Sequence, residues 1–171
     1  MISIVPATPS DSATIVALWN AKRLDAQSCW FGADAIDENY VAQLMATGMT
    51  VVLAQLDAVP AGFGLWYSVA DEARMVALAA DDPAVYYHLM SNFCIWGIAA
   101  QHTSGFAELG TAATTERSWM DALSVIQYVT IGYEPQPPDQ TGQQRVPRLL
   151  RAECELLVLS SAVTQALEGL S

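Results

Sequence analysis

The chain has 171 residues, a formal net charge of −11 and 53% hydrophobic residues. The length suits one domain with a single core, and the negative charge excludes a nucleic-acid partner because it repels phosphate backbones. No run reaches the uninterrupted apolar length of a membrane span, and no basic segment precedes an apolar one at the N-terminus. We therefore expect an acidic, cytoplasmic protein without a membrane partner.

Cysteine and histidine usage argues against metal and disulfide chemistry. Cys29, Cys94 and Cys154 are widely spaced and form no Cys-x-x-Cys pair, which indicates reduced, buried thiols. The sequence holds no His-x-x-x-His pair and no Gly-x-Ser-x-Gly turn, so neither a metal site nor a serine hydrolase is expected. Because only 15% of the residues are charged, we expect a partner to bury part of the surface, most simply in a homodimer.

The first half of the chain predicts a strand, two helices and a three-stranded meander. Thr8, Pro9 and Asp11 have the spacing of a helix start, and a second helix is expected from Asp37 to Gly48. Alternating or apolar runs predict strands at 2–5, 50–57, 61–69 and 74–80. A Gly-x-Gly within the strand at 61–69 opens no helix, so it is not interpreted as a dinucleotide motif.

The second half predicts a central helix at 84–101, which is apolar nearly all round. A strand follows at 107–113. A hydroxyl and an acid at helix-start spacing, Ser118 and Asp121, then predict a helix that ends at Gly132. An extended piece at 133–139, a polar loop at 140–144, a strand at 148–159 and a closing helix at 160–170 complete the chain. The expected fold is α/β with a mixed sheet in a single domain, in the order β-α-α-β-β-β-α-β-α-β-β followed by a helix.

Several local phrases in this order resemble the GCN5-related N-acetyltransferase (GNAT) family over residues 2–135. Ile-Val-Pro-Ala-Thr at 4–8, with Asp11, resembles the family's opening strand and first helix cap, and Val-Pro-Ala-Gly-Phe at 59–63 resembles the start of its third strand. Asp81-x-Pro83 resembles the end of its fourth strand. Tyr128-Val-Thr-Ile-Gly132-Tyr133 matches the family pattern of a tyrosine, three residues, a glycine and an aromatic residue.

The resemblance implies an acyl-CoA-dependent N-acyltransferase that transfers acetyl, or another acyl group, from its CoA thioester to a small-molecule or peptide amine. Tyr128 would be the catalytic acid that protonates the leaving thiolate, or would simply cap the core beside Gly132. Backbone groups of Ala79, Ala80 and Asp81 would contact the pantetheine arm, and Asp121 is placed with the cofactor contacts. A general base is not assigned; Asp81, Asp82 and Glu108 are available.

The sequence departs from the family at the pyrophosphate loop, where members carry R/Q-x-x-G-x-G/A. The matching cofactor-binding positions here are Tyr86, Tyr87, His88, Leu89, Met90 and Ser91. The basic residue is replaced by a tyrosine, and the central glycine is replaced by a leucine whose side chain stands where the backbone should approach a phosphate. Three hypotheses follow: an acyltransferase with an atypical loop, a catalytically inactive binding or assembly module of the same fold, or an enzyme with an acyl donor that lacks the nucleotide.

Overall fold

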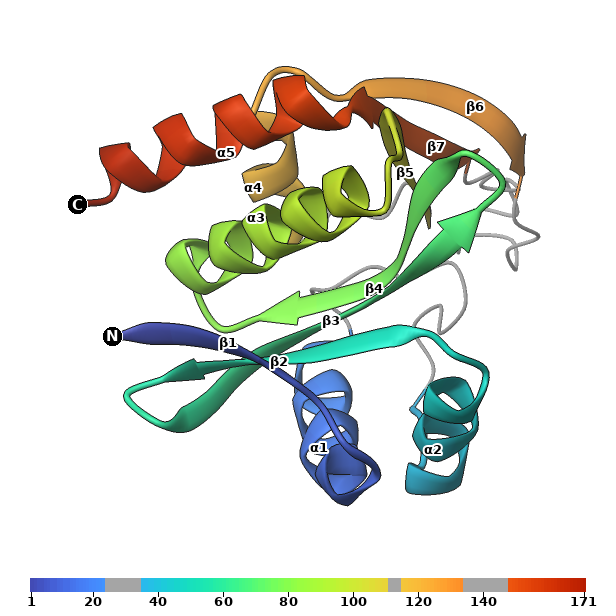
Figure 1. Cartoon of the computed structure of the whole chain (residues 1–171), viewed down its shortest axis with the longest axis vertical. Coiled ribbons are helices and arrows are strands. Elements are labelled where there is room, and N and C mark those ends of the chain that lie inside the picture. The colour runs from blue at the N-terminus through green and yellow to red at the C-terminus, as the bar shows by residue number, and fades with distance from the viewer. Residues whose placement is uncertain (24–34, 111–114, 134–147) are drawn as a thin grey trace, which may run out of the picture.

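The computed structural model describes residues 1–23, 35–110, 115–133 and 148–171 (Figure 1). Its seven strands form one sheet in the order β1-β2-β3-β4-β5-β7-β6. The strands are β1 (Ile2–Pro6), β2 (Thr50–Leu56), β3 (Val59–Val69), β4 (Glu72–Ala80), β5 (Ser104–Gly110), β6 (Gln127–Tyr133) and β7 (Arg148–Glu155). The α-helices are α1 (Ser12–Lys22), α2 (Glu38–Ala46), α3 (Pro83–Ala99), α4 (Thr115–Ala122) and α5 (Leu156–Gly169). The predicted order of elements is confirmed.

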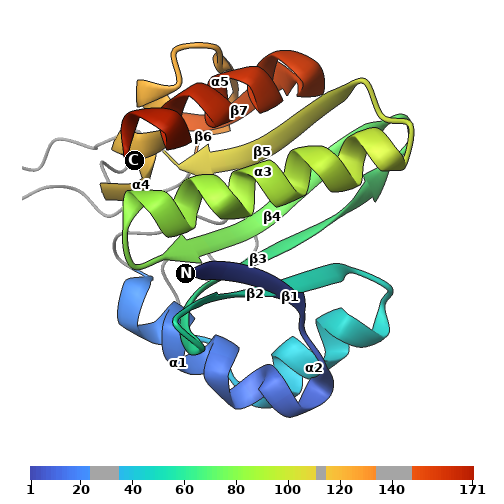
Figure 2. The same cartoon turned by 60° about the vertical axis from the view of Figure 1, so that its left-hand side comes forward.

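Helices cover both faces of the sheet, as Figures 1 and 2 show. One face of the N-terminal strands packs against α1 and α2 through a cluster around Trp19 and Phe63, which are both fully buried. The other face packs against α3 and α5 through a cluster around Trp66, Leu89 and Phe93. Because α3 packs on the sheet, on α5 and on α4, it is apolar on most of its circumference.

Side-chain caps fix where the helices begin. The Asp82 carboxylate accepts a hydrogen bond of 2.9 Å from the backbone N–H of Val85, and Pro83 occupies the first helical position of α3. Asp37 caps α2 in the same way by accepting from the N–H of Tyr40 at 2.8 Å. These caps satisfy N–H groups that a helix leaves unpaired at its start. At the start of α3, the N–H of Val85 is therefore already paired with Asp82.

The glycines of β3 serve packing. A Cβ atom on Gly64 would lie 2.2 Å from the ring of Trp66, and one on Gly62 would lie 2.6 Å from the carbonyl oxygen of Ala79. Both positions therefore need glycine for close contact within the antiparallel meander β2-β3-β4. This agrees with the decision not to interpret them as a dinucleotide motif.

The sheet opens between β4 and β5, which are its one parallel pair. The two strands pair only over residues 72–75 with 104–107, and no pairing continues beyond Met75 and Ala107. At the same level β4 carries a bulge, since Leu65 faces Ala77 while Trp66 faces Met75, which leaves Val76 as the extra residue. We call the space between the diverging strands the fork.

The helix expected from Ser118 to Gly132 is wrong in both bounds. The helix α4 begins at Thr115 and ends at Ala122, and Ser124 follows in the left-handed region with φ 59°. Residues 127–133 form the strand β6, because tyrosine and the β-branched residues valine, threonine and isoleucine suit a strand paired with β7. Tyr128 is therefore on a strand and not on a helix.

The boundary between the last strand and the last helix also differs from the prediction. The strand expected at 148–159 ends at Glu155, and α5 begins at Leu156. Leu156, Leu159 and Val163 are buried at the three- and four-residue spacing of a helix, which accounts for the change. The polar loop predicted at 140–144, and all of the extended piece predicted at 133–139 except its first residue, lie outside the described residues.

Candidate functional site

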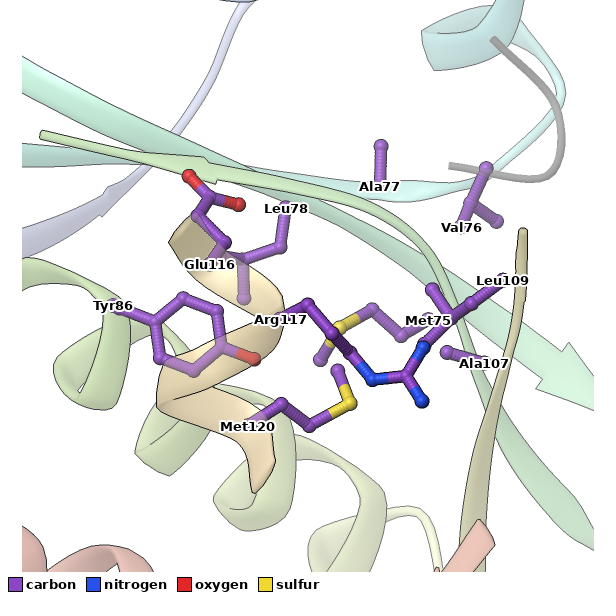
Figure 3. Close-up of a pocket in the computed structure, with 10 residues that line it drawn as sticks. All are labelled: Met75, Val76, Ala77, Leu78, Tyr86, Ala107, Leu109, Glu116, Arg117 and Met120. Carbon is purple, nitrogen blue, oxygen red and sulfur yellow. The ribbon is translucent and has the colours of Figure 1, made fainter. Parts of the chain in front are cut away.

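A small cavity lies in the fork, beneath α4 (Figure 3). Its walls come from β4, β5, the first turn of α3 and α4. They are Met75, Val76, Ala77, Leu78, Tyr86, Ala107, Leu109, Glu116, Arg117 and Met120. The free volume is about 20 Å³, which is room for about one water molecule. Among the described residues, these side chains therefore occupy most of the space under α4. We call this space the fork cavity.

Glu116 makes the main polar contact of the fork cavity. Its carboxylate accepts a hydrogen bond of 2.5 Å from the backbone N–H of Ala80, the last residue of β4. Glu116 is 5% exposed, and a buried carboxylate is costly unless it is hydrogen-bonded. The bond therefore ties the start of α4 to the end of β4. Ala80 is one of the residues that the resemblance assigns to the pantetheine arm.

Tyr86 fills the part of the fork cavity next to α3. It is 2% exposed, and its ring packs edge-on against Tyr87 and Trp119, with centroids 5.6 Å and 5.5 Å away. The hydroxyl points into the cavity and has no hydrogen-bond partner among the described residues (Figure 3). Burial, and then the charge of Glu116, raise the pKa of Tyr86 well above its ordinary value. The phenol therefore stays neutral.

Tyr128 lies beside the fork cavity in a polar cluster with α4. Its hydroxyl donates to the carboxylate of Asp121, and the guanidinium of Arg117 stacks 4.1 Å from the centre of its ring. Arg117 also donates to Asp121 at 3.1 Å. Burial and the bond to Asp121 raise the pKa of Tyr128 to about 12. The structure thus brings the predicted residues Tyr128 and Asp121 together, with the phenol protonated and its proton directed at Asp121.

The pattern that suggested Tyr128 falls elsewhere in the fold. In the family pattern, the tyrosine stands four positions before the glycine, with three residues between them. Ser124 is the left-handed residue just after α4, and Met120 lies four positions before it, on the helix and in the wall of the fork cavity. Gly132 lies inside a strand, has no positive φ, and would tolerate a Cβ without contact within 4 Å. The helix-ending role of Gly132 is therefore wrong.

The other predicted cofactor contacts are mostly buried in the core. Tyr87, Leu89 and Met90 are 6%, 0% and 2% exposed, and the Tyr87 hydroxyl donates to the carbonyl of Trp119 at 3.0 Å. His88 and Ser91 are half-buried. Met90 lines a second small cavity, also about 20 Å³, under α5. Of the predicted set, only Tyr86 lines the fork cavity.

The turn before α3 carries negative charge. Asp81 is exposed and pairs with Lys22 at 3.2 Å, while the carboxylate of Asp82 accepts from the N–H of Val85. Among the described residues, the basic group that pairs with this turn, Lys22, is thus already neutralised by an aspartate. An anionic ligand would meet a second carboxylate here, and the start of α3 attracts anions only through its remaining N–H groups.

These residues do not fit acyl-CoA. The N–H at the end of β4 is occupied by Glu116, the fork holds about one water, and Leu89 is packed in the core where a small residue would let the backbone meet a phosphate. Sequence reasoning missed Glu116, Arg117 and Met120, because residues 114–117 are polar and carry no periodic signal. Only the position of α4 brings these three side chains into the fork.

Metal-ligand groups, membrane-spanning helices and cysteines were each surveyed in the described part of the chain. Within the described residues, no group of three or more histidine, cysteine or acidic side chains could hold a metal ion. The described part of the chain also contains no helix long and apolar enough to cross a membrane. Cys94 and Cys154 are free and buried, as expected, and burial raises the pKa of the Cys94 thiol to about 12.

Comparison with known proteins finds relatives by structure alone. No family model matches the sequence, and no curated protein matches it. The structure of yncA from Salmonella typhimurium, solved with its cofactor acetyl-CoA, aligns with a TM-score of 0.65 and 14% identity over 91% of this chain and 94% of that one. An N-acetyltransferase from Staphylococcus aureus Mu50 aligns with a TM-score of 0.67 and 10% identity over 91% and 99%. A GNAT-family acetyltransferase from Streptococcus pneumoniae aligns with a TM-score of 0.61 and 15% identity over 89% and 98%.

These likenesses extend over nearly the whole of both chains, and their TM-scores of 0.61–0.67 show a shared fold. At identities of 10–15% they bear on the fold and not on the activity. The chain has the fold of the GNAT acetyltransferases.

Proposed function

We propose that this chain is a binding or assembly module with the GNAT fold, in which the acyl-CoA groove has been closed by the protein's own α4. The observation that carries the proposal is the hydrogen bond from the Ala80 N–H to the buried carboxylate of Glu116. A ligand that needs the end of β4 has to displace this bond. A hydrogen bond to a charged group contributes about 1.5–3 kcal/mol, and leaving the carboxylate buried without it costs more.

Packing supports the same conclusion independently of that bond. Tyr86 and Met120 fill the fork from α3 and α4, and both are at most 8% exposed. Admitting a pantetheine arm would require α4 to lift away and these side chains to leave the core. Removing a buried aromatic side chain from its packing costs about 3–5 kcal/mol, to be subtracted from the affinity of any donor.

The negative charge of the chain also disfavours acyl-CoA binding. The pyrophosphate of CoA would approach a turn with two aspartates on a protein whose net charge is −11. A surface of this kind lowers the local concentration of anions and raises that of cations. The surface therefore favours neutral or cationic partners over nucleotides.

The test is a calorimetric titration of acetyl-CoA into the purified chain, with yncA from Salmonella typhimurium as the positive control because its structure holds acetyl-CoA. We expect heat from yncA and none from this chain at millimolar ligand. Saturable binding to this chain at micromolar acetyl-CoA would overturn the proposal. The Glu116→Ala variant is titrated in parallel. Binding to this variant alone would mean that the Glu116–Ala80 hydrogen bond is what keeps acetyl-CoA out, and no binding would mean that packing also excludes it.

A second candidate is acyl-CoA-dependent N-acyl transfer to a small-molecule or peptide amine, with an atypical pyrophosphate loop. It is favoured by the bulge at Val76, at the level where β4 and β5 diverge, and by two protonated phenols, Tyr86 in the fork cavity and Tyr128 beside it. Its test is release of thiol from acetyl-CoA in the presence of a panel of amines. Activity that falls in Tyr128→Phe and persists in Tyr40→Phe, a half-buried tyrosine of α2 on the other face of the sheet, would establish this candidate in place of the first.

A further inference from the structure

We propose that a groove beside α5 binds a basic, amphipathic segment of another protein, an assignment that rests on the proposed binding role and gives it a partner chemistry. Two surface grooves, with free volumes of about 380 Å³ and 410 Å³, lie at the start of α5 and along it. Val125 and Val158 line both, so the two are continuous, and we call the combined surface the α5 groove. It shares no lining residue with the fork cavity, so it is a separate site.

One half of the α5 groove is an apolar helix face. Leu157 and Val158 are 63% and 44% exposed, although both side chains are aliphatic. The residues of α5 that line this half recur at the spacing of one helix face and carry no charge; they are Leu157, Val158, Ser161, Ala162 and Gln165. This face is about 12 Å long, or roughly two helical turns. A partner helix with apolar side chains at the same spacing can lie along it.

The other half of the α5 groove is acidic. Glu72 of β4 lines it together with Glu153 and Glu155 at the end of β7. Arg151 donates to Glu72 at 2.6 Å and to Glu153 at 2.9 Å, so one guanidinium is shared between two carboxylates. Glu155 is exposed and takes part in none of the ion pairs found among the described residues. The acidic half therefore keeps an excess of negative charge.

Charge and apolar surface together define the partner. A groove lined by one sign of charge concentrates ions of the opposite sign, and the net charge of −11 adds to this field. A second copy of the chain, a nucleic acid or an anionic lipid surface is therefore repelled. A small cation would occupy the acidic half and leave Leu157 and Val158 in water. A protein segment with lysine or arginine at one end of an apolar helix face contacts both halves at once.

The experiment measures the fluorescence anisotropy of labelled synthetic peptides titrated with the full chain. Two peptides of about 14 residues, or roughly 21 Å as helices, carry leucines at helical spacing and lysines at the N-terminal end of one and the C-terminal end of the other. Two matched peptides carry glutamates in place of the lysines. We expect saturable binding of a lysine peptide at micromolar concentrations of the chain, and no binding of either glutamate peptide.

Four surface variants locate the binding. Leu157→Ser should weaken it about tenfold because an apolar contact is lost, whereas Val59→Ser should not, since this valine is 64% exposed on β3 and lies outside the groove. Glu155→Lys should weaken it about threefold to tenfold. Glu168→Lys changes the net charge equally, at an exposed glutamate outside the groove, and should leave the affinity unchanged. Circular dichroism verifies that each variant is folded.

Failure of both lysine peptides to bind, equal binding of the glutamate peptides, or equal losses in a groove variant and its control would each overturn the proposal. Light scattering on the full chain tests another occupant: a dimer that Leu157→Ser dissociates would assign the α5 groove to a second copy and overturn the proposal too. Acetyl-CoA is titrated into the wild type separately. Binding there would contradict the proposed closure of the fork, and the peptide result would stand unaffected.

Discussion

The backbone N–H of Ala80 donates to the carboxylate of Glu116, 36 residues further along the chain, and this bond closes the fork of the sheet. It joins the end of β4 to the first turn of α4, so that the helix lies over the place where β4 and β5 diverge. The fold is that of the GNAT acetyltransferases, and the fork cavity beneath α4 has a free volume of about 20 Å³.

The first prediction concerns the contribution of this bond to stability. Glu116→Ala leaves the Ala80 N–H buried and unpaired, which should lower the free energy of unfolding by about 1–3 kcal/mol. Glu116→Gln keeps an acceptor and should lose less. Chemical denaturation measures both, with the exposed Glu168→Ala as a control that should change little. Equal stability of Glu116→Ala and wild type would show that the bond does not hold α4.

The two neighbouring tyrosines of α3 should respond oppositely to loss of their hydroxyl groups. Tyr86→Phe removes a buried hydroxyl that has no partner among the described residues, so stability should be unchanged or rise by up to about 1 kcal/mol. Tyr87→Phe removes a bond of 3.0 Å to the carbonyl of Trp119 and should lose about 0.5–1.5 kcal/mol. Thermal unfolding of the pair is the measurement. A larger loss in Tyr86→Phe than in Tyr87→Phe would mean that its hydroxyl has a partner.

Two glycines provide a matched test of the packing. Gly64→Ala places a methyl group 2.2 Å from the fully buried ring of Trp66 and should destabilise the chain by about 1–3 kcal/mol. Gly132→Ala meets nothing within 4 Å and should be tolerated. Denaturant midpoints for both variants give the comparison. If Gly132→Ala were strongly destabilising, Gly132 would need to be a glycine after all, as the family pattern implied.

The stability of the chain should fall at alkaline pH, and Tyr128 should account for part of the fall. Its pKa rises from 10.0 to about 12 in the folded chain, through burial and the bond to Asp121. The folded state therefore holds this proton more tightly than the unfolded state, and the resulting stability is complete below pH 10 and is lost as pH rises through 12. Tyr128→Phe should flatten this decline, though not abolish it, because burial also raises the pKa of Tyr86 and Tyr87. The measurement is the free energy of unfolding of wild type and Tyr128→Phe at several pH values between 8 and 12. If both lose stability equally as the pH rises, the assignment to Tyr128 is contradicted.

The sequence was sufficient to predict the order of the elements along the chain. Caps at Asp37 and Asp82, alternation in β2 and β3, and the apolar central helix are local signals that survive folding. The helix predicted at 118–132 failed for a physical reason. Ser118 and Asp121 have capping-box spacing but lie inside α4, and pairing with β7 overrides the helical periodicity of Leu123, Ile126 and Val129.

The site was harder to predict than the fold. Sequence alone could show that Tyr86 and Leu89 do not suit a phosphate, because that argument needs only side-chain size and charge. It could not show what fills the groove instead. Glu116 is a single acid in a polar segment, and its role depends on a contact with Ala80 that exists only once α4 has packed on the sheet. Contacts over such separations leave no periodic trace in the sequence.

The most direct test of the closed groove is the amide signal of Ala80 in a heteronuclear NMR spectrum of the labelled chain, recorded with and without acetyl-CoA. We predict an N–H that is strongly protected from exchange with solvent, that loses this protection in Glu116→Ala, and that does not shift when millimolar acetyl-CoA is added to the wild type. An Ala80 amide that exchanges freely, or that shifts and saturates as acetyl-CoA is titrated, would contradict the account.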